Sequence, residues 1–227
     1  MFGILVPDFN SVVEPELSKM RLPDVSNQTA RFALDASVVE NIAVAAERLS
    51  TCGIESWIVG LATDSFPNGY TLLDQGIEEL RDRTGLPVHT ASYAVHAALD
   101  YLGLRRIAIV TPFDEATNIH VRTAFEGRGY EVVAMAGLAC AGFDQIASTP
   151  DEETLQAFAS VAKNPVEGLV QVGTGLPMLH LIEELERRFD LPVVASNPAS
   201  YWQGLRAAGI TDVVPGAGRL LEANPAS

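Results

Sequence analysis

The sequence predicts an α/β fold built from two related halves, each a parallel β-sheet covered by helices. Short runs of β-branched and apolar residues alternate with helical patterns along nearly the whole 227-residue chain, which is typical of a parallel sheet with helices on both faces. Segments of the first half also recur, in the same order, in the second half. Duplication of one α/β unit accounts for both observations.

Each element follows from a local pattern of apolar residues. Strands are expected where short apolar runs stand between turn residues, and helices where apolar residues return every three to four positions. The expected strands are residues 2–6, 54–61, 87–90, 106–111, 131–136, 168–172, 192–195 and 212–214. The expected helices are residues 35–52, 70–84, 91–103, 115–129, 151–163, 176–189 and 199–208.

The repeat is clearest where a helix runs into a strand. Residues 77–88 (IEELRDRTGLPV) match residues 182–193 (IEELERRFDLPV) at eight of twelve positions, at an offset of 105. Two further pairs of segments match in the same order: residues 3–7 with 108–112, and residues 59–63 with 170–174. Convergence of two amphipathic helices explains the first match equally well, but three co-linear matches favour duplication. We expect one lobe from residues 1–92 with about 200–227, and a second from residues 93–199.

Composition and charge exclude several classes of partner. The chain is 48% hydrophobic and 19% charged, as expected for a packed globular protein. The net charge of −14 is spread along the chain, and the densest cationic group is the dipeptide Arg105-Arg106, so we expect no nucleic-acid binding. An anionic ligand would meet the same repulsive field, so it needs short-range donors in a sheltered pocket.

The sequence also bears on location and metals. Its apolar runs are too short to cross a bilayer, and its N-terminus is interpreted as a first strand rather than a signal peptide. Cys52 and Cys140 lack the spacing of a zinc site, and the four histidines show no metal-binding spacing. We therefore expect a cytoplasmic protein with no metal and no membrane partner.

Candidate ligand-binding residues lie after the strands, because ligands of open α/β sheets bind beyond the carboxyl ends of the strands. The neutral polar residues and glycines of these loops are Asn10, Thr63, Gly173, Thr174, Gly175 and Asn197. Each polar residue can instead cap a helix, and Gly-Thr-Gly can be a plain strand-to-helix turn. Together they are the donors that a small carboxylate or an enediolate requires. No P-loop or complete dinucleotide fingerprint is present, which disfavours ATP and NAD.

Two aspartates of the same loops can carry proton transfer. Asp64 and Asp114 are candidate general acids or bases if burial raises the pKa of the carboxyl, and each can equally be a loop-capping aspartate. Asp64 is our candidate catalytic residue.

Three segments carry a resemblance to a known superfamily: residues 3–16 (GILVPDFNSVVEPE), 190–209 (DLPVVASNPASYWQGLRAAG) and 215–220 (PGAGRL). The chain resembles the aspartate/glutamate racemase superfamily over essentially its whole length, and within it the arylmalonate decarboxylases and maleate cis-trans isomerases. The resemblance implies two Rossmann-like lobes related by pseudo-twofold symmetry. It also implies cofactor-free removal or addition of a proton next to a carboxylate, often by two cysteines that face each other across the substrate.

The sequence departs from that superfamily at the cysteines. By resemblance, Ala62 stands at the first cysteine position and Gly173 at the second, so the usual thiolate nucleophile or base is missing. The resemblance implies that the carboxylate-binding residues are retained, and it gives a role to three further positions. Asn10, Thr63, Thr174, Gly175 and Asn197 are retained, Phe113 replaces an oxyanion-hole tyrosine, and Phe143 and Ile146 match an apolar pocket.

Two functions of different classes follow. The first is a cofactor-independent isomerase or decarboxylase (lyase) of a small carboxylic acid, which forms an enediolate-like state and uses a non-cysteine group such as Asp64. The second is a catalytically silent homologue that binds a small carboxylate as a sensor or regulatory subunit. A substituted variant of an active enzyme is a third interpretation. The sequence allows a homo-oligomer without requiring one.

Overall fold

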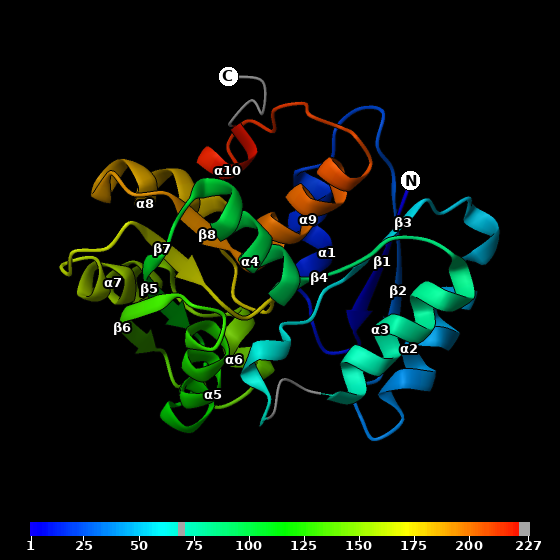
Figure 1. Cartoon of the computed structure of the whole chain (residues 1–227), viewed down its shortest axis with the longest axis horizontal. Helices are drawn as coiled ribbons and strands as arrows, with labels where there is room; N and C mark the ends of the chain where they lie inside the picture. The colour runs from blue at the N-terminus through cyan, green and yellow to red at the C-terminus, as the bar shows by residue number, and fades with distance from the viewer. Residues whose placement is uncertain (68–70, 223–227) are drawn as a thin grey trace.

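Two parallel β-sheets, each with four strands, form the framework of the protein, shown in Figure 1 as a computed structural model that describes residues 1–67 and 71–222. The strand order is β2-β1-β3-β4 in the first sheet and β6-β5-β7-β8 in the second. The strands are β1 Phe2–Pro7, β2 Asn27–Phe32, β3 Ser56–Val59, β4 Val88–Thr90, β5 Arg106–Thr111, β6 Glu131–Gly137, β7 Gly168–Gln171 and β8 Val193–Ala195.

Helices connect the strands and cover the sheets. The helices are α1 Val13–Lys19, α2 Val38–Glu47, α3 Thr71–Thr84, α4 Ala91–Leu102, α5 Glu115–Glu126, α6 Phe143–Ala147, α7 Asp151–Val161, α8 Ile182–Phe189, α9 Ser196–Ala207 and α10 Arg219–Glu222. Short 3₁₀ turns are η1 Ser50–Cys52, η2 Thr63–Ser65 and η4 Leu179–Leu181.

The two sheets have the same topology, which confirms the predicted α/β fold of two related lobes. The central strand of each sheet, β1 or β5, pairs in parallel with the second and third strands of its own lobe. The fourth strands, β4 and β8, begin 105 residues apart, which is the offset of the sequence repeat. The proposed division at residues 92 and 200 stays a prediction, because α4 and α9 contact strands of both lobes.

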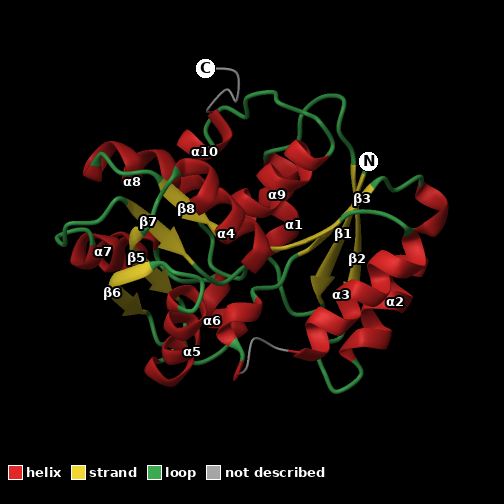
Figure 2. Cartoon of the chain, in the orientation of Figure 1, coloured by secondary structure: helices red, strands yellow, loops and turns green. Residues whose placement is uncertain are grey.

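The helices form three layers around the sheets (Figure 2). Helices α2 and α3 cover the outer face of the first sheet, α7 and α8 lie against the second, and α1, α4 and α9 lie between the sheets. The central layer encloses an apolar core to which both sheets contribute, for example Ile58 and Val170. The lobes are therefore held in register by a shared core, and the strand ends of one face those of the other.

Local signals fix the ends of the central helices. Thr90 accepts a hydrogen bond from the N–H of Tyr93 at the start of α4, and Gly103, with φ of 69°, caps its C-terminus. Asp114 likewise caps α5 by accepting from the N–H of Thr117. Such caps satisfy N–H groups that have no partner within the helix.

Some predicted elements were wrong. Residues 212–214 form no strand; Val214 instead donates its N–H to the carbonyl of Leu221 in α10. Strand β2 was not predicted, because its sequence NQTARF is mostly polar at the edge of the sheet. Helix α1 was not predicted either; its Pro15 stands in the first helical turn, where proline is tolerated. The predicted start of a helix at residue 70 and the end of the first lobe at 223–227 lie outside the described residues.

No helix within residues 1–67 and 71–222 is long and apolar enough to span a bilayer.

Candidate active site

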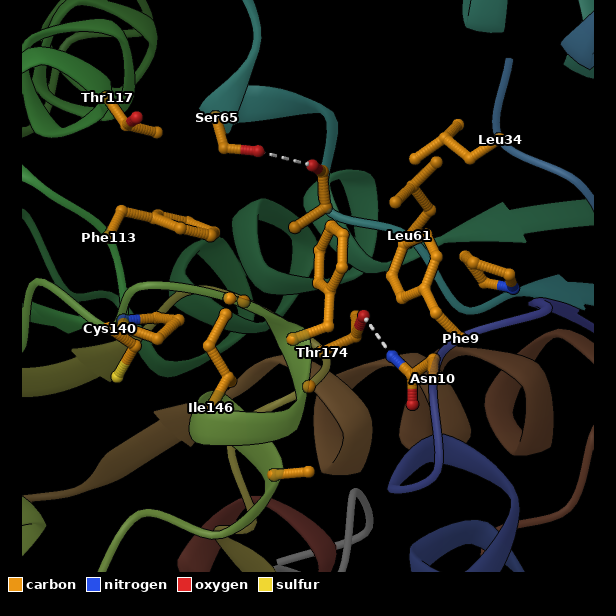
Figure 3. A pocket seen from close by; sticks show the side chains of 18 of the residues that line it. Phe9, Asn10, Leu34, Leu61, Ser65, Phe113, Thr117, Cys140, Ile146 and Thr174 are labelled. Atoms are coloured by element: carbon orange, nitrogen blue, oxygen red, sulfur yellow. Dashed lines mark hydrogen bonds between the residues drawn. The ribbon is translucent and has the colours of Figure 1, made fainter.

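A cavity of about 500 Å³ lies between the lobes at the carboxyl ends of β1, β3, β5 and β7 (Figure 3). Its wall is formed by Pro7, Phe9, Asn10, Ser11, Leu34, Leu61, Ala62, Ser65, Phe66, Pro112, Phe113, Asp114, Thr117, Cys140, Ala141, Gly142, Phe143, Ile146, Ala147, Gly173, Thr174 and Gly175. The predicted ligand loops of both halves thus meet at one site. Its volume is in the range of small-molecule sites.

A hydrogen-bonded chain joins the two lobes at the polar end of the cavity. The amide nitrogen of Asn10 donates to the Thr174 hydroxyl over 3.1 Å, and that hydroxyl donates to the carbonyl of Gly60 over 3.1 Å. The Asn10 amide oxygen accepts the N–H groups of Val12 and Val13 at the start of α1. Asn10 therefore caps a helix, as one of its two interpretations held, and also lines the cavity.

Backbone donors complete this polar end. The N–H groups of Thr174 and Gly175 have no acceptor among the described residues, and both residues line the cavity. Consecutive unpaired N–H groups form an anion-binding nest. The Gly173-Thr174-Gly175 turn thus offers two backbone donors at this end of the cavity.

The rest of the wall is mostly apolar. Phe9 of the first lobe stacks on Phe143 of the second, with ring centroids 3.6 Å apart and planes inclined by 18°. Phe113 and Ile146 also face the cavity, while Phe143 is 52% exposed at its edge. The predicted apolar positions Phe113, Phe143 and Ile146 therefore come together, next to Phe9, which the sequence analysis did not single out.

Ala62 and Gly173 occupy related places at the ends of β3 and β7. Both line the cavity, one in each lobe. Ala62 has an extended backbone with φ of −90°, whereas Gly173 has φ of +121°. A Cβ built on Gly173 would lie 2.8 Å from Cδ of Pro112, so this turn accommodates glycine alone without rearrangement.

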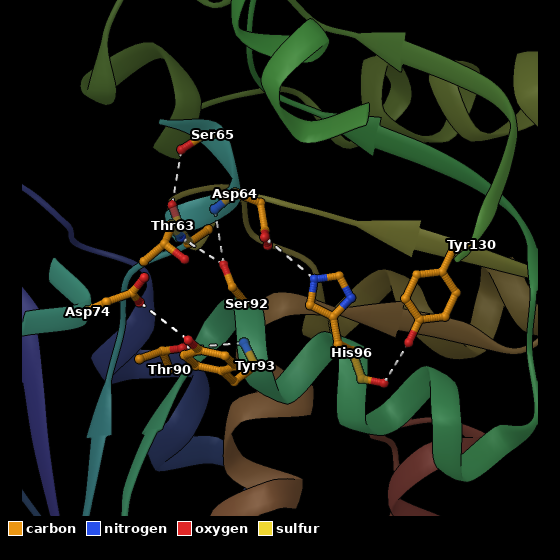
Figure 4. Close-up of polar contacts among 10 residues, drawn as sticks. Thr63, Asp64, Ser65, Asp74, Thr90, Ser92, Tyr93, His96 and Tyr130 are labelled. Carbon is orange, nitrogen blue, oxygen red and sulfur yellow. Dashed lines mark hydrogen bonds and ion pairs between the residues drawn. The ribbon is translucent and has the colours of Figure 1, made fainter. Parts of the chain in front are cut away.

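Two serines hold these strand ends in place in a similar way. The hydroxyl of Ser92, in the first turn of α4, accepts the N–H groups of Thr63 and Asp64 over 2.8 and 3.2 Å (Figure 4). The hydroxyl of Ser196, at the start of α9, accepts the N–H of Gly173 over 3.2 Å. Sequence reasoning missed both serines, although each stands in the first turn of a helix that directly follows a short strand.

Thr63 and Asp64 do not line this cavity. They border a second, separate cavity with Asp74, Tyr93 and Arg128. Asp64 is buried, and its Oδ1 lies 3.5 Å from Nε2 of His96 (Figure 4). Burial raises the pKa of the Asp64 carboxyl, but the hydrogen bond and charge of His96, together with the Ser92 hydroxyl and the charge of Arg128, outweigh burial and hold that pKa below its usual value. Asp64, the predicted acid or base, is therefore an ionised partner of His96 and lies outside the cavity between the lobes.

Asn197 is also behind the wall. Its amide nitrogen donates to the Thr174 carbonyl over 3.0 Å and to Oε2 of Glu16 over 2.8 Å. Glu16 is buried and was not among the candidate residues predicted from the sequence. A lone glutamate beside a proline carries no signal that distinguishes it from Glu14.

The titratable side chains on the described part of the wall are Asp114 and Cys140. The N–H of Thr117 holds the pKa of the Asp114 carboxyl below its usual value. The Cys140 thiol lies 3.6 Å from the hydroxyl of Thr149, and in Figure 3 its sulfur points away from Thr174. Within the described residues, no group of three or more His, Cys, Asp or Glu side chains is arranged to hold a metal ion.

Comparison with known proteins places this arrangement in a family. The family profile for arylmalonate decarboxylase matches residues 2–221. The chain belongs to the arylmalonate decarboxylase family. It is 30% identical to the arylmalonate decarboxylase of Bordetella bronchiseptica over 97% of this chain and 95% of that protein. It is 25% identical to the maleate isomerase of Nocardia farcinica over 99% of this chain and 96% of that protein.

The solved structures of relatives support the same fold. A variant of the Nocardia farcinica maleate cis-trans isomerase with a covalently bound succinylcysteine intermediate matches with a TM-score of 0.82 at 23% identity, over 97% of each chain. The relatives are thus isomerases and decarboxylases of small carboxylic acids, and the fold is their two-lobed one. The resemblance stated from the sequence is confirmed at the level of the family.

Proposed function

We propose that the protein is a cofactor-independent enzyme that forms an enediolate-like state from a small carboxylic acid, and that the reaction is decarboxylation. The observation that carries the proposal is the division of one cavity into a polar end, at Asn10, Thr174 and Gly175, and an apolar remainder. The activity of the relative at 30% identity supports the same reaction class.

Decarboxylation needs the two kinds of surface that this cavity offers. When the bond to the departing carboxylate breaks, carbon dioxide leaves, and the electron pair is delocalised onto the carboxylate that stays as an enediolate. N–H donors such as those of Thr174 and Gly175 stabilise the growing charge on that carboxylate. A departing carboxylate beside Phe9, Phe113 and Ile146 exchanges water for apolar surface, which favours conversion to neutral carbon dioxide.

Isomerisation fits the cavity less well. It requires either a nucleophile, as the succinylcysteine of the maleate isomerase variant illustrates, or an acid and a base on opposite sides of the substrate. The facing positions at the strand ends are Ala62 and Gly173, which supply neither. We therefore assign the final proton to water, and expect the product to form in both mirror-image configurations when its carbon is a stereocentre.

A second candidate function is favoured by one observation. Neither Ala62 nor Gly173 offers an acid or base, while the donors at Thr174 and Gly175 are in place. A protein with donors but without a proton-transfer group can bind a small carboxylate without converting it, as a sensor or regulatory subunit.

A panel of acids tests the proposal. Phenylmalonate, an alkylmalonate, maleate and aspartate would be screened for a rise in melting temperature, and then for carbon dioxide release or formation of the isomer. We expect binding and decarboxylation of the malonates with an apolar substituent. Stabilisation by these acids without turnover would support the silent homologue instead, and no response to any acid would remove both functions. Cys140→Ala serves as a control, because its thiol faces Thr149, and should retain the activity.

A further inference from the structure

Glu16 joins the two lobes directly behind the polar end of the cavity. We infer that Glu16 is a positioning residue that fixes the anion-binding turn of the second lobe onto helix α1 of the first. Its effect on ligand binding rests on the proposed function, whereas its effect on the turn does not.

Three N–H donors from the second lobe and α9 converge on this carboxylate. Oε1 accepts the backbone N–H groups of Met178 and Leu179 over 2.6 and 2.7 Å, and Oε2 accepts from the amide nitrogen of Asn197 over 2.8 Å. The Glu16 residue is only 5% exposed. Short hydrogen bonds to an ionised acceptor are stronger than those between neutral groups.

The partners of the Glu16 carboxylate are N–H groups rather than a cation. Among the described residues, no Lys, Arg or His side chain forms an ion pair with Glu16. Burying a charge is costly unless it is hydrogen-bonded, and here the N–H groups of Met178 and Leu179 and the Asn197 amide offset that cost. A neutral or shorter side chain cannot serve all three donors at once.

The contacts of Glu16 lead straight to the cavity. The same side-chain nitrogen of Asn197 donates both to Glu16 and, over 3.0 Å, to the carbonyl of Thr174. Met178 and Leu179 continue the same segment of chain beyond Gly175. Asn10 caps the N-terminus of α1 and donates to the Thr174 hydroxyl. Helix α1 therefore holds the Thr174 turn at two points.

Positioning and simple electrostatics predict opposite effects of removing this charge. A negative charge near a carboxylate site repels the ligand, so neutralising it would tighten binding if charge were all that mattered. If Glu16 positions the turn, Glu16→Gln must weaken binding instead. The glutamine side chain replaces one acceptor oxygen by an NH₂ group, which faces a donor rather than accepting from it. At least one of the three donors therefore loses its acceptor.

The test compares Glu16→Gln with Glu14→Gln, which removes the same charge from the exposed side of the same helix. Phenylmalonate affinity would be measured by calorimetry, and exchange of the Met178 and Leu179 amide protons by NMR without ligand. We expect Glu16→Gln to bind about tenfold more weakly or worse, with faster exchange at Met178 or Leu179, and Glu14→Gln to match the wild type in both.

Unchanged or tighter binding by folded Glu16→Gln would overturn the positioning role. If the wild type binds no carboxylate, the proposed function fails, and amide exchange alone decides the inference: equal exchange in the wild type and Glu16→Gln would overturn it, and faster exchange would support it. If Glu16→Gln does not fold, the milder Glu16→Asp variant is measured in the same way, and wild-type exchange there would likewise overturn the inference.

Discussion

Asn10 of the first lobe donates a hydrogen bond to the hydroxyl of Thr174 in the second, although 164 positions separate the two residues. The bond is buried, and the same hydroxyl donates onward to the carbonyl of Gly60. One threonine side chain therefore joins the ends of β1, β3 and β7 at the polar end of the cavity. The alignment of the two lobes and the binding of a ligand depend on the same atoms.

Thr174→Val should impair both stability and binding. Valine keeps the shape of threonine but leaves the Asn10 nitrogen and the Gly60 carbonyl without their partner, at a cost of about 1–3 kcal/mol in the free energy of unfolding. Urea unfolding with and without phenylmalonate checks this. Thr123→Val on the exposed face of α5 makes the same chemical change away from the cavity and should have little effect. Equal stability and equal ligand response of the two variants would contradict the account.

Ser92→Ala should loosen the wall of the cavity from behind. The Ser92 hydroxyl is the acceptor for the N–H groups of Thr63 and Asp64, and both would be left buried without a partner. We expect a lower melting temperature and weaker stabilisation by phenylmalonate. Ser160→Ala, which removes an exposed hydroxyl from α7, is the matched control. A Ser92→Ala protein that melts and binds like the control would exclude this role.

Asp64→Asn should change how stability depends on pH. The pKa of the Asp64 carboxyl is lower in the folded protein than in the unfolded chain, so its ionised form stabilises the fold. That contribution is fully present above the unfolded-state pKa of about 3.9 and is lost as the pH falls through the lower folded-state pKa. The variant should therefore be less stable at neutral pH and lose less stability on acidification. Denaturant titrations at several pH values check this. If the stabilities of the wild type and Asp64→Asn changed with pH in the same way, the lowered pKa of Asp64 would be contradicted.

The sequence predicted the loops of the site better than the roles of their residues. Alternation of elements and the internal repeat located the carboxyl ends of β1, β3, β5 and β7, because both depend on local patterns. Asn10, Thr174 and Gly175, which follow two of these strands, all line the cavity. Asp64 was expected at the same site, but in the 3₁₀ turn η2 its side chain points toward His96. In such a turn neighbouring side chains point in different directions, so a shift of one residue changes which side chain faces the cavity.

Residues that act across the lobes could not be found in this way. Glu16 accepts the N–H groups of Met178 and Leu179, 162 and 163 positions away, and nothing in its neighbours marks those partners. The positive φ of Gly173 is likewise a property of the three-dimensional turn, since any glycine in a Gly-Thr-Gly sequence can also adopt ordinary backbone angles. Patterns of polarity locate elements, whereas the partners of buried polar groups require the packed lobes.

A thiol introduced at Ala62 should be tolerated, whereas one at Gly173 should not. Ala62 has an extended backbone that any residue adopts, but Gly173 has φ of +121° and contacts Pro112, so Gly173→Cys should cost about 1 kcal/mol or more. In a Cys140→Ala background, the thiol of Ala62→Cys should react with a small alkylating reagent, and phenylmalonate should slow that reaction. A labelling rate that phenylmalonate leaves unchanged would mean that the acid binds outside this cavity.

The most direct test of the account follows phenylmalonate in deuterium oxide with the wild-type protein and Thr174→Val. We predict that the wild type releases carbon dioxide and places one solvent deuteron on the product carbon, because the N–H groups of Thr174 and Gly175 stabilise the enediolate and water returns the proton. Thr174→Val should be about 10²-fold slower, the effect typical of disturbing one oxyanion donor set. A folded wild-type protein that binds phenylmalonate but releases no carbon dioxide would contradict the proposed enzyme and identify a carboxylate-binding homologue.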